Sequence, residues 1–208
     1  MFSFPNKLYP ITDTGIAKAS HADQVAQMCS GGARLIQLRE KLLTPREFFR
    51  QAETALMIAH NCGARLILND RVDMALALRA DGVHLGQDDL PPEAARKLLG
   101  PDAIIGYSTH NAGQAALAVQ LPINYIAIGP IFSTSTKANP DEVVGLDGLR
   151  RVREVVGDMP LVAIGGIDLN RAAAVTAAGA DAVAVISAIA AGNIPDNTAH
   201  FLQVLSAI

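Results

Sequence analysis

The chain has 208 residues, of which half are apolar and 18% are charged; this excludes a disordered chain and allows one sizeable core. Its net charge of −3 disfavours a general nucleic-acid binder, and no apolar run reaches the ~18 residues of a membrane span. The N-terminus has no secretory pattern, so we expect a cytoplasmic protein that binds neither nucleic acid nor membranes. We expect Cys29 and Cys62 to be small buried side chains rather than a disulfide or zinc ligands. No sequence feature indicates the oligomeric state.

Eight short runs rich in β-branched residues recur along the chain, and each is followed by polar or glycine residues. Continuous apolar runs of this length are typical of parallel strands buried on both faces. The runs begin at Leu8, Leu35, Arg65, Gly82, Ile104, Tyr125, Leu161 and Ala182.

The segments between the runs have helical character. The clearest follows the second run, where Thr44, Pro45 and Glu47 form a capping box with proline at the first helical position. Asn61, Cys62 and Gly63 then end that helix. Further helices are expected over 73–79, 92–99, 111–119, 145–156, 170–178 and 199–205.

Eight strand–helix units predict a (β/α)8 TIM barrel that forms a single domain over residues 1–208. The alternative is a doubly wound open sheet, which usually has fewer strands and a glycine-rich turn after the first one. Here the first run ends in Asp13-Thr14-Gly15 without that turn, which favours the barrel. Barrel enzymes place their sites at the carboxyl ends of the strands, so the residues after each run are the candidate site.

The second run carries Gln37, Arg39 and Lys41 at alternate positions. A period of two places all three on one face, directed at the barrel mouth. Two cations and an amide there suit an anion site. The alternative is a solvated strand end in which Glu40 pairs with Arg39 or Lys41.

The third and fourth runs end in acidic residues, Asn69-Asp70 and Gln87-Asp88-Asp89. Neighbouring strands bring these carboxylates together, although Asp89 could instead cap the helix that follows. Beside the cations of the second run, Asp70 and Asp89 suggest a Mg²⁺ ion that also binds a diphosphate.

The later runs end in hydroxyls and glycines. Ser108 follows the fifth run, and the sixth leads into a hydroxyl-rich segment that closes with Lys137, which suits clamping phosphate oxygens or, alternatively, is a surface loop. Gly165-Gly166 and Ile186-Ser187 follow the seventh and eighth runs, where backbone N–H groups often bind a phosphate. The sequence therefore predicts two anion sites at one mouth, for a diphosphate and for a monophosphate.

These motifs together resemble the thiamine phosphate synthase family, over nearly the whole chain. One departure is Ser133, where the family usually has proline. The matching segments are LYPITD at 8–13, QLREK at 37–41, LND at 68–70, GVHLGQDD at 82–89, GYSTH at 106–110, GPIF at 129–132, TSTK at 134–137, IGG at 164–166 and VIS at 185–187.

The family joins an aminopyrimidine diphosphate to a thiazole monophosphate, which gives thiamine phosphate and pyrophosphate. The resemblance implies a dissociative, Mg²⁺-assisted reaction in which electrostatics and positioning replace a protein nucleophile. It implies that Gln37 contacts the aminopyrimidine and that the diphosphate is held by Arg39, Lys41, Asn69, Ser108 and Lys137. It implies that Asp70 and Asp89 ligate Mg²⁺. It also implies that the thiazole phosphate pocket is lined by Thr134, Ser135 and Thr136, and that its phosphate is held by Gly166, Ile186 and Ser187. Arg39, Lys41, Ser108 and Lys137 are the expected catalytic groups.

Two other functions stay open. A thiazole tautomerase-like isomerase would bind one monophosphate and would not need Asp70 and Asp89 beside the cations. A non-catalytic phosphate-binding barrel would not need the metal ligands. Of the two histidines near these motifs, His84 is expected to fill the barrel interior and His110 to have a packing or capping role.

Overall fold

The computed structural model describes residues 2–134 and 141–207 of the chain. Eight parallel strands form one sheet, in which β2 to β8 pair in chain order and β1 pairs with β8. The strands are β1 (Leu8–Pro10), β2 (Leu35–Leu38), β3 (Arg65–Asn69), β4 (Gly82–Leu85), β5 (Ile104–Thr109), β6 (Tyr125–Ile128), β7 (Leu161–Ile164) and β8 (Ala182–Val185).

The sheet curls into a nearly closed ring, and the seam lies between β1 and β2. Just beyond β1, Ile11 forms an isolated parallel bridge with Gln37. The Thr12 N–H donates to the Gln37 carbonyl at 2.9 Å as part of this bridge, which joins the segment after β1 to β2. The predicted (β/α)8 barrel is confirmed.

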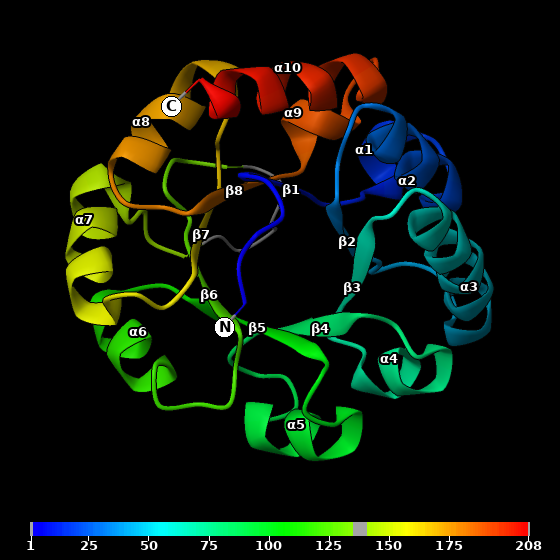
Figure 1. Cartoon of the computed structure of the whole chain (residues 1–208), viewed down its shortest axis with the longest axis horizontal. Helices are drawn as coiled ribbons and strands as arrows, with labels where there is room; N and C mark the ends of the chain where they lie inside the picture. The colour runs from blue at the N-terminus through cyan, green and yellow to red at the C-terminus, as the bar shows by residue number, and fades with distance from the viewer. Residues whose placement is uncertain (1, 135–140, 208) are drawn as a thin grey trace.

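Helices surround the strands as an outer ring (Figure 1). The predicted helix after the second run is confirmed, with the Thr44–Glu47 capping box formed. The helices are α1 (Thr14–Ala17), α2 (His21–Ser30), α3 (Pro45–Asn61), α4 (Val72–Leu78), α5 (Pro92–Leu99), α6 (Ala112–Ala118), α7 (Gly145–Val156), α8 (Leu169–Ala177), α9 (Ser187–Ala190) and α10 (Ile194–Ser206).

The strands are buried on both faces, as their apolar sequences predict. A larger apolar cluster fills the space between strands and helices. A smaller one fills the barrel interior, where Tyr9 and Tyr125 are fully buried and form an edge-to-face pair. Phe2 and Phe4 pack against Tyr125 from the N-terminal segment. The bottom of the barrel is thus filled by aromatic rings, and space for a ligand is left at the other end.

The N-terminal ends of β3, β5 and β7 share one hydrogen-bonding pattern. In each of these strands, the backbone N–H of the first or second residue donates a hydrogen bond of 2.8 Å. The acceptor is the side chain of the residue that directly precedes the next strand. A basic side chain also contacts each acceptor. The three sets are Leu66, Asp81 and His60; Ile105, Asn124 and Arg96; and Leu161, Asp181 and Arg153. Polar contacts at this end therefore stabilise the barrel and leave the opposite end to the site.

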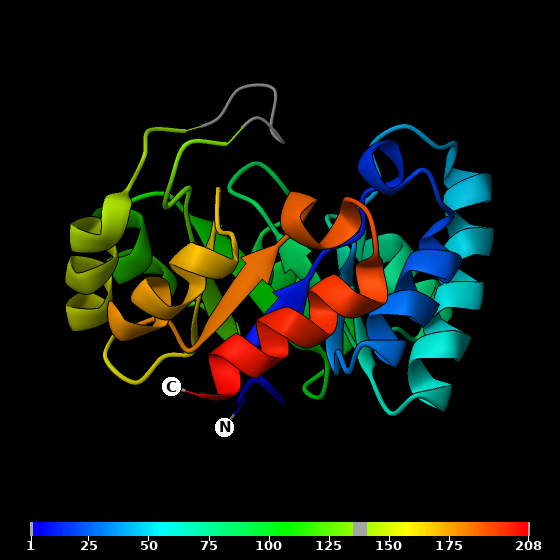
Figure 2. The ribbon, with the colours of Figure 1, turned by 90° about the horizontal axis from the view of Figure 1, so that it is seen from above.

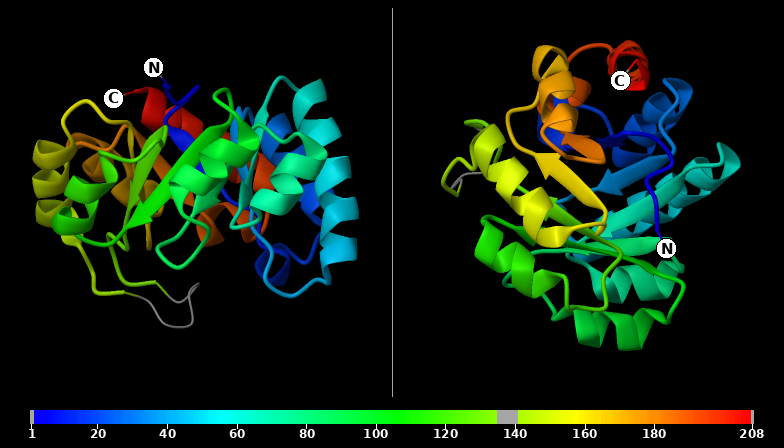
Figure 3. Two further views of the ribbon diagram at one scale, coloured as in Figure 1. Left: turned by 90° about the horizontal axis from the view of Figure 1, so that it is seen from below. Right: turned by 60° about the vertical axis from the view of Figure 1, so that its left-hand side comes forward.

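The loops that follow the strands lie on the side of the barrel opposite to both chain termini (Figures 2 and 3). No helix within the described ranges is long and apolar enough to span a membrane.

Cys29 is buried as predicted, but the prediction for Cys62 is wrong, because this thiol is exposed. Cys62 is the C-cap of α3, where the chain leaves the helix.

Candidate active site

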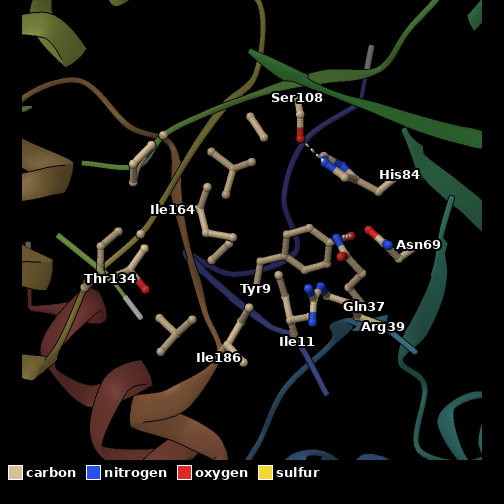
Figure 4. A pocket seen from close by; sticks show the side chains of 18 of the residues that line it. Tyr9, Ile11, Gln37, Arg39, Asn69, His84, Ser108, Thr134, Ile164 and Ile186 are labelled. Atoms are coloured by element: carbon tan, nitrogen blue, oxygen red, sulfur yellow. Dashed lines mark hydrogen bonds between the residues drawn. The ribbon is translucent and has the colours of Figure 1, made fainter. Parts of the chain in front are cut away.

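A cavity of about 370 Å³ opens at the carboxyl ends of the strands. In Figure 4, Gln37, Arg39, Asn69 and Ser108 lie on one side of it, while Thr134 and Ile186 lie on the other. Ten of the residues expected to form the site line this cavity: Gln37, Arg39, Lys41, Asn69, Asp70, Ser108, Thr134, Gly166, Ile186 and Ser187. Ser135, Thr136 and Lys137 lie outside the described residues.

The cations after β2 reach the cavity from beyond the strand, which ends at Leu38. The Arg39 guanidinium lies 3.6 Å from the Asp13 carboxylate, and the Lys41 ammonium lies 2.6 Å from Asp70. The alternative in which Glu40 pairs with either cation is wrong, because Glu40 turns away and contacts His21 at 2.8 Å. Both cations therefore line the cavity. Each contacts one carboxylate and stays partly exposed to solvent.

The two predicted metal ligands, Asp70 and Asp89, lie next to each other. Asp70 follows β3 with a φ of 63°, a left-handed conformation that is uncommon outside glycine. Asp89 accepts from the Gly86 N–H at 2.6 Å and closes the turn after β4. It does not cap α5, which has no side-chain cap. Burial raises the pKa of the Asp89 carboxyl, and the hydrogen-bonded Asp70 raises it further.

Burial is the larger cause of this shift, and the neighbouring Asp70 carboxylate adds to it because like charges disfavour each other. Within residues 2–134 and 141–207, no group of three or more His, Cys, Asp or Glu side chains could enclose a metal. Asp70 lines the open cavity and Asp89 lies beside it, which matches the way Mg²⁺ is held, by one or two protein oxygens with water and substrate phosphates completing the shell.

A chain of buried hydrogen bonds crosses the barrel beneath the cavity. The Gln37 amide donates to the Tyr9 hydroxyl at 3.1 Å, and the Tyr9 and Tyr125 hydroxyls are 2.9 Å apart. His84 contacts the Tyr125 hydroxyl through Nδ1 at 3.0 Å and Ser108 through Nε2 at 2.8 Å. The predicted interior position of His84 is confirmed. Its link to Ser108 is visible in Figure 4, and its link to Tyr125 has no sequence signal, because β4 and β6 are not neighbours in the sheet.

Burial lowers the pKa of His84 to about 4, so its imidazole is neutral near pH 7. A neutral imidazole has one donor and one acceptor nitrogen, which matches its two hydroxyl partners. These hydrogen bonds therefore fix the two cavity-lining groups at the ends of the chain of contacts, the Gln37 amide and the Ser108 hydroxyl.

The opposite wall consists of glycine backbone, apolar side chains such as Ile164 and Ile186, and the hydroxyl of Ser187. Gly166 has a φ of 63°, and a Cβ there would lie 2.5 Å from the Ser133 carbonyl oxygen. Arg171 donates to the Gly166 carbonyl at 2.7 Å, and its guanidinium lies over the Phe132 ring. Gly166 thus allows the loops after β6 and β7 to approach closely. This packing role adds to the phosphate-binding role that the sequence suggested for its backbone N–H.

His110 contacts the backbone at the cavity wall. Its Nδ1 lies 2.8 Å from the Gly129 carbonyl oxygen and 3.4 Å from the Asp141 carboxylate. The first contact is consistent with the predicted packing role. Asp141, which also lines the cavity, was missed from the sequence because it lies in an irregular segment remote from any strand end.

The chain is similar throughout its length to proteins of one activity. The family model described as thiamine monophosphate synthase matches residues 8–189. A thiamine-phosphate synthase from Chloroflexus aurantiacus is 42% identical over 203 residues, which cover 97% of this chain and 93% of that protein. One from Methanospirillum hungatei is 46% identical over 183 residues, 88% of each chain. A solved structure, thiamine phosphate pyrophosphorylase from Pyrococcus furiosus, matches with a TM-score of 0.87 at 36% identity, over 97% of this chain and 96% of that one.

Proposed function

The chain belongs to the thiamine monophosphate synthase family and its activity is that of a thiamine-phosphate synthase, and we propose that the two walls of its cavity divide the substrates between them. The wall from β2 to β5 takes the aminopyrimidine diphosphate. The wall from β6 to β8 takes the thiazole monophosphate. The observation that carries this proposal is the contact of Lys41 with Asp70, which adjoins Asp89, on the β2–β5 side of the cavity.

On the diphosphate wall, Arg39 and Lys41 supply positive charge, and Asn69 and Ser108 supply hydrogen-bonding groups. Asp70 and Asp89 would hold Mg²⁺, which when bound adds positive charge beside the diphosphate oxygens. The two carboxylates fit this ion because they offer hard oxygen ligands and leave room for phosphate. Lys137 is proposed to join these groups on the basis of sequence alone.

On the opposite wall, Gly166, Ile186 and Ser187 would hold the thiazole phosphate through backbone N–H groups and the Ser187 hydroxyl. Thr134, with Ser135 and Thr136 proposed from sequence, would line the rest of this pocket. Gln37, held by Tyr9, would orient the aminopyrimidine ring.

The reaction then requires charge stabilisation rather than a nucleophilic side chain. The carbon–oxygen bond to the diphosphate breaks, and its electron pair leaves with pyrophosphate. The thiazole nitrogen donates its lone pair to the resulting pyrimidine methyl cation and forms the new carbon–nitrogen bond. Arg39, Lys41 and Ser108 act by stabilising the charge that grows on the leaving group, which is strongest in the transition state.

An isomerase that binds one monophosphate would leave the Lys41–Asp70–Asp89 cluster without a use, and so would a non-catalytic phosphate-binding barrel. Neither alternative has an observation in its favour on the diphosphate wall.

The test is turnover with both substrates, in which thiamine phosphate and pyrophosphate should form in equal amounts. Asp89→Asn should lower the Mg²⁺-dependent rate at least about 10²-fold, because one metal ligand loses its charge. Asp88→Asn is the matched control: Asp88 adjoins Asp89 but is exposed, and its variant should keep the wild-type rate. Full activity in excess chelator, or equal losses in the two variants, would contradict the metal assignment.

A further inference from the structure

Behind the cations of the diphosphate wall lies a buried polar group made of Thr12, His21 and Glu40. Thr12 and His21 are fully buried, and the Glu40 side chain is 4% exposed. None of the three lines the cavity described above, so they do not reach a ligand held there. They come from the loop after β1, the first turn of α2 and the loop after β2.

The direction of the hydrogen bonds in this group follows from the number of protons available. The Arg39 N–H donates to Thr12 Oγ1 at 3.2 Å, and Thr12 Oγ1 lies 2.8 Å from His21 Nδ1. His21 Nε2 lies 2.8 Å from the Glu40 carboxylate, an acceptor, so the imidazole proton is on Nε2. The Thr12 hydroxyl therefore donates to Nδ1. Burial lowers the pKa of His21 despite the nearby Glu40, which is consistent with this neutral form.

The second oxygen of Glu40 holds the backbone of the following segment. It accepts from the N–H groups of Lys41 at 2.7 Å, Leu42 at 2.5 Å and Leu43 at 3.1 Å. Burial by itself raises the pKa of Glu40, but the hydrogen bonds from Leu42, His21 and the other N–H groups lower it overall. The carboxylate is thus charged and fully hydrogen-bonded, and it restrains three consecutive residues.

The two ends of this group hold the backbone N–H groups of the two cations themselves. Thr12 binds the N–H of Arg39, and Glu40 binds the N–H of Lys41. We propose that Thr12, His21 and Glu40 form a positioning relay, which fixes the Arg39–Lys41 backbone so that both side chains reach the diphosphate. This inference rests on the proposed function of that wall. Long cationic side chains lose less entropy on binding when their backbone is already held in place.

Two variants test the relay, one at each end. Glu40→Gln keeps an acceptor for the backbone N–H groups but places its amide N–H against the Nε2–H of His21. Thr12→Val removes the hydroxyl while the shape of the side chain stays nearly constant. Each should weaken binding of inorganic pyrophosphate with Mg²⁺, measured by calorimetry, and raise the KM for the aminopyrimidine diphosphate by about tenfold, since small displacements of binding groups are costly. The KM for the thiazole phosphate should stay unchanged.

Glu47→Gln is the matched control. Glu47 is also a carboxylate that accepts a backbone N–H, that of Thr44 in the α3 capping box, but it belongs to no relay. Glu47→Gln should lower the stability of the fold but leave pyrophosphate affinity and both KM values unchanged. All affinities are measured at a temperature where circular dichroism shows each variant folded, so that loss of fold is not read as loss of binding.

A double-variant comparison separates positioning from general structural support. The effect of Thr12→Val on pyrophosphate affinity should shrink when Arg39→Ala is already present, because Thr12 acts through Arg39. Equal effects in both backgrounds, wild-type affinity in Glu40→Gln and Thr12→Val, or an equal rise in both KM values would overturn the relay. If Arg39→Ala itself leaves pyrophosphate binding unchanged, the proposed diphosphate wall is wrong, which is a different outcome.

Discussion

The ionisable residues of this barrel differ in pKa because their surroundings differ. His84 is enclosed by Tyr125 and Ser108, and burial lowers its pKa to about 4. Asp89 shows the opposite shift for a carboxyl group, because burial and Asp70 both disfavour its charge. The sequence predicted that Asp70 and Asp89 lie close together, but it did not predict the burial that is the main cause of both pKa shifts. The residue types at the strand ends, however, did predict most of the side chains that line the cavity.

The pKa of His84 predicts that acid destabilises the fold. An unfolded histidine binds a proton near its ordinary value of 6.5, whereas folded His84 does not until about pH 4. The unfolded state therefore gains protons as the pH falls through this window, and His84 contributes a loss on the order of 3 kcal/mol. Buried His21, whose pKa is also lowered, acts in the same direction.

Urea unfolding at pH 7.5 and pH 4.5 measures this loss. His84→Gln should lose less stability than the wild type between the two pH values, and His200→Gln, at an exposed position, should behave as the wild type does. The same loss in His84→Gln and in the wild type would show that His84 titrates normally.

Lys137 is assigned from the sequence only, as the last residue of the hydroxyl-rich segment after β6. If it contacts the leaving pyrophosphate, Lys137→Ala should slow the chemical step on the order of 10²-fold while changing KM little. Single-turnover kinetics measure that step directly. Lys97→Ala, on α5 and away from the cavity, is the control, and an unchanged single-turnover rate in Lys137→Ala would place Lys137 outside the reaction.

At the scale of elements, the sequence predicted best where an apolar stripe and its caps agree. α3 has five buried apolar residues at helical spacing and a complete capping box, and its bounds were predicted. α2 was expected only as a helical stretch that ends at Gly31, without a start, because its buried face includes His21 and Gln24, polar side chains that interrupt the stripe. α1 and α9 have four residues each, too few to show a period. α10 begins at Ile194, before the predicted residue 199, because Asn193 caps it.

The contact between the β6 and β7 loops gives a prediction for Gly166→Ala. An added methyl group would press on the Ser133 carbonyl oxygen and on Phe132, whose Cβ would be 2.8 Å away. Displacing these loops should raise the KM for the thiazole phosphate and leave pyrophosphate binding nearly intact. It should also destabilise the fold by more than the roughly 1–2 kcal/mol expected from a left-handed backbone alone.

Gly63→Ala is the control for the backbone cost. Gly63 has a similar φ of 68°, but no atom lies within 4 Å of an added Cβ. The difference in unfolding free energy between the two variants therefore reports the loop contact. If the two variants are equally stable, or if pyrophosphate affinity falls as much as thiazole phosphate affinity, the assignment of this wall to the monophosphate is wrong.

At the scale of the whole molecule, the barrel gathers residues of both proposed walls around one cavity of about 370 Å³. The fold and this gathering could be predicted because parallel strands all direct their carboxyl ends to the same side. The hydrogen-bonded interior and the relay behind Arg39 could not, because they depend on side chains from β1, α2, β4 and β6 that meet only when the ring closes. The acidic chain still binds anions here, because local charges set the local field.

The most direct test of this arrangement is a crystal structure of the protein with Mg²⁺, pyrophosphate and the thiazole phosphate bound together. The expected density shows pyrophosphate against Arg39 and Lys41, with the metal between it and the Asp70 and Asp89 carboxylates. The thiazole phosphate should lie on the other wall, against the backbone at Gly166 and Ser187. Both anions on one wall, or a metal held by neither Asp70 nor Asp89, would contradict the account.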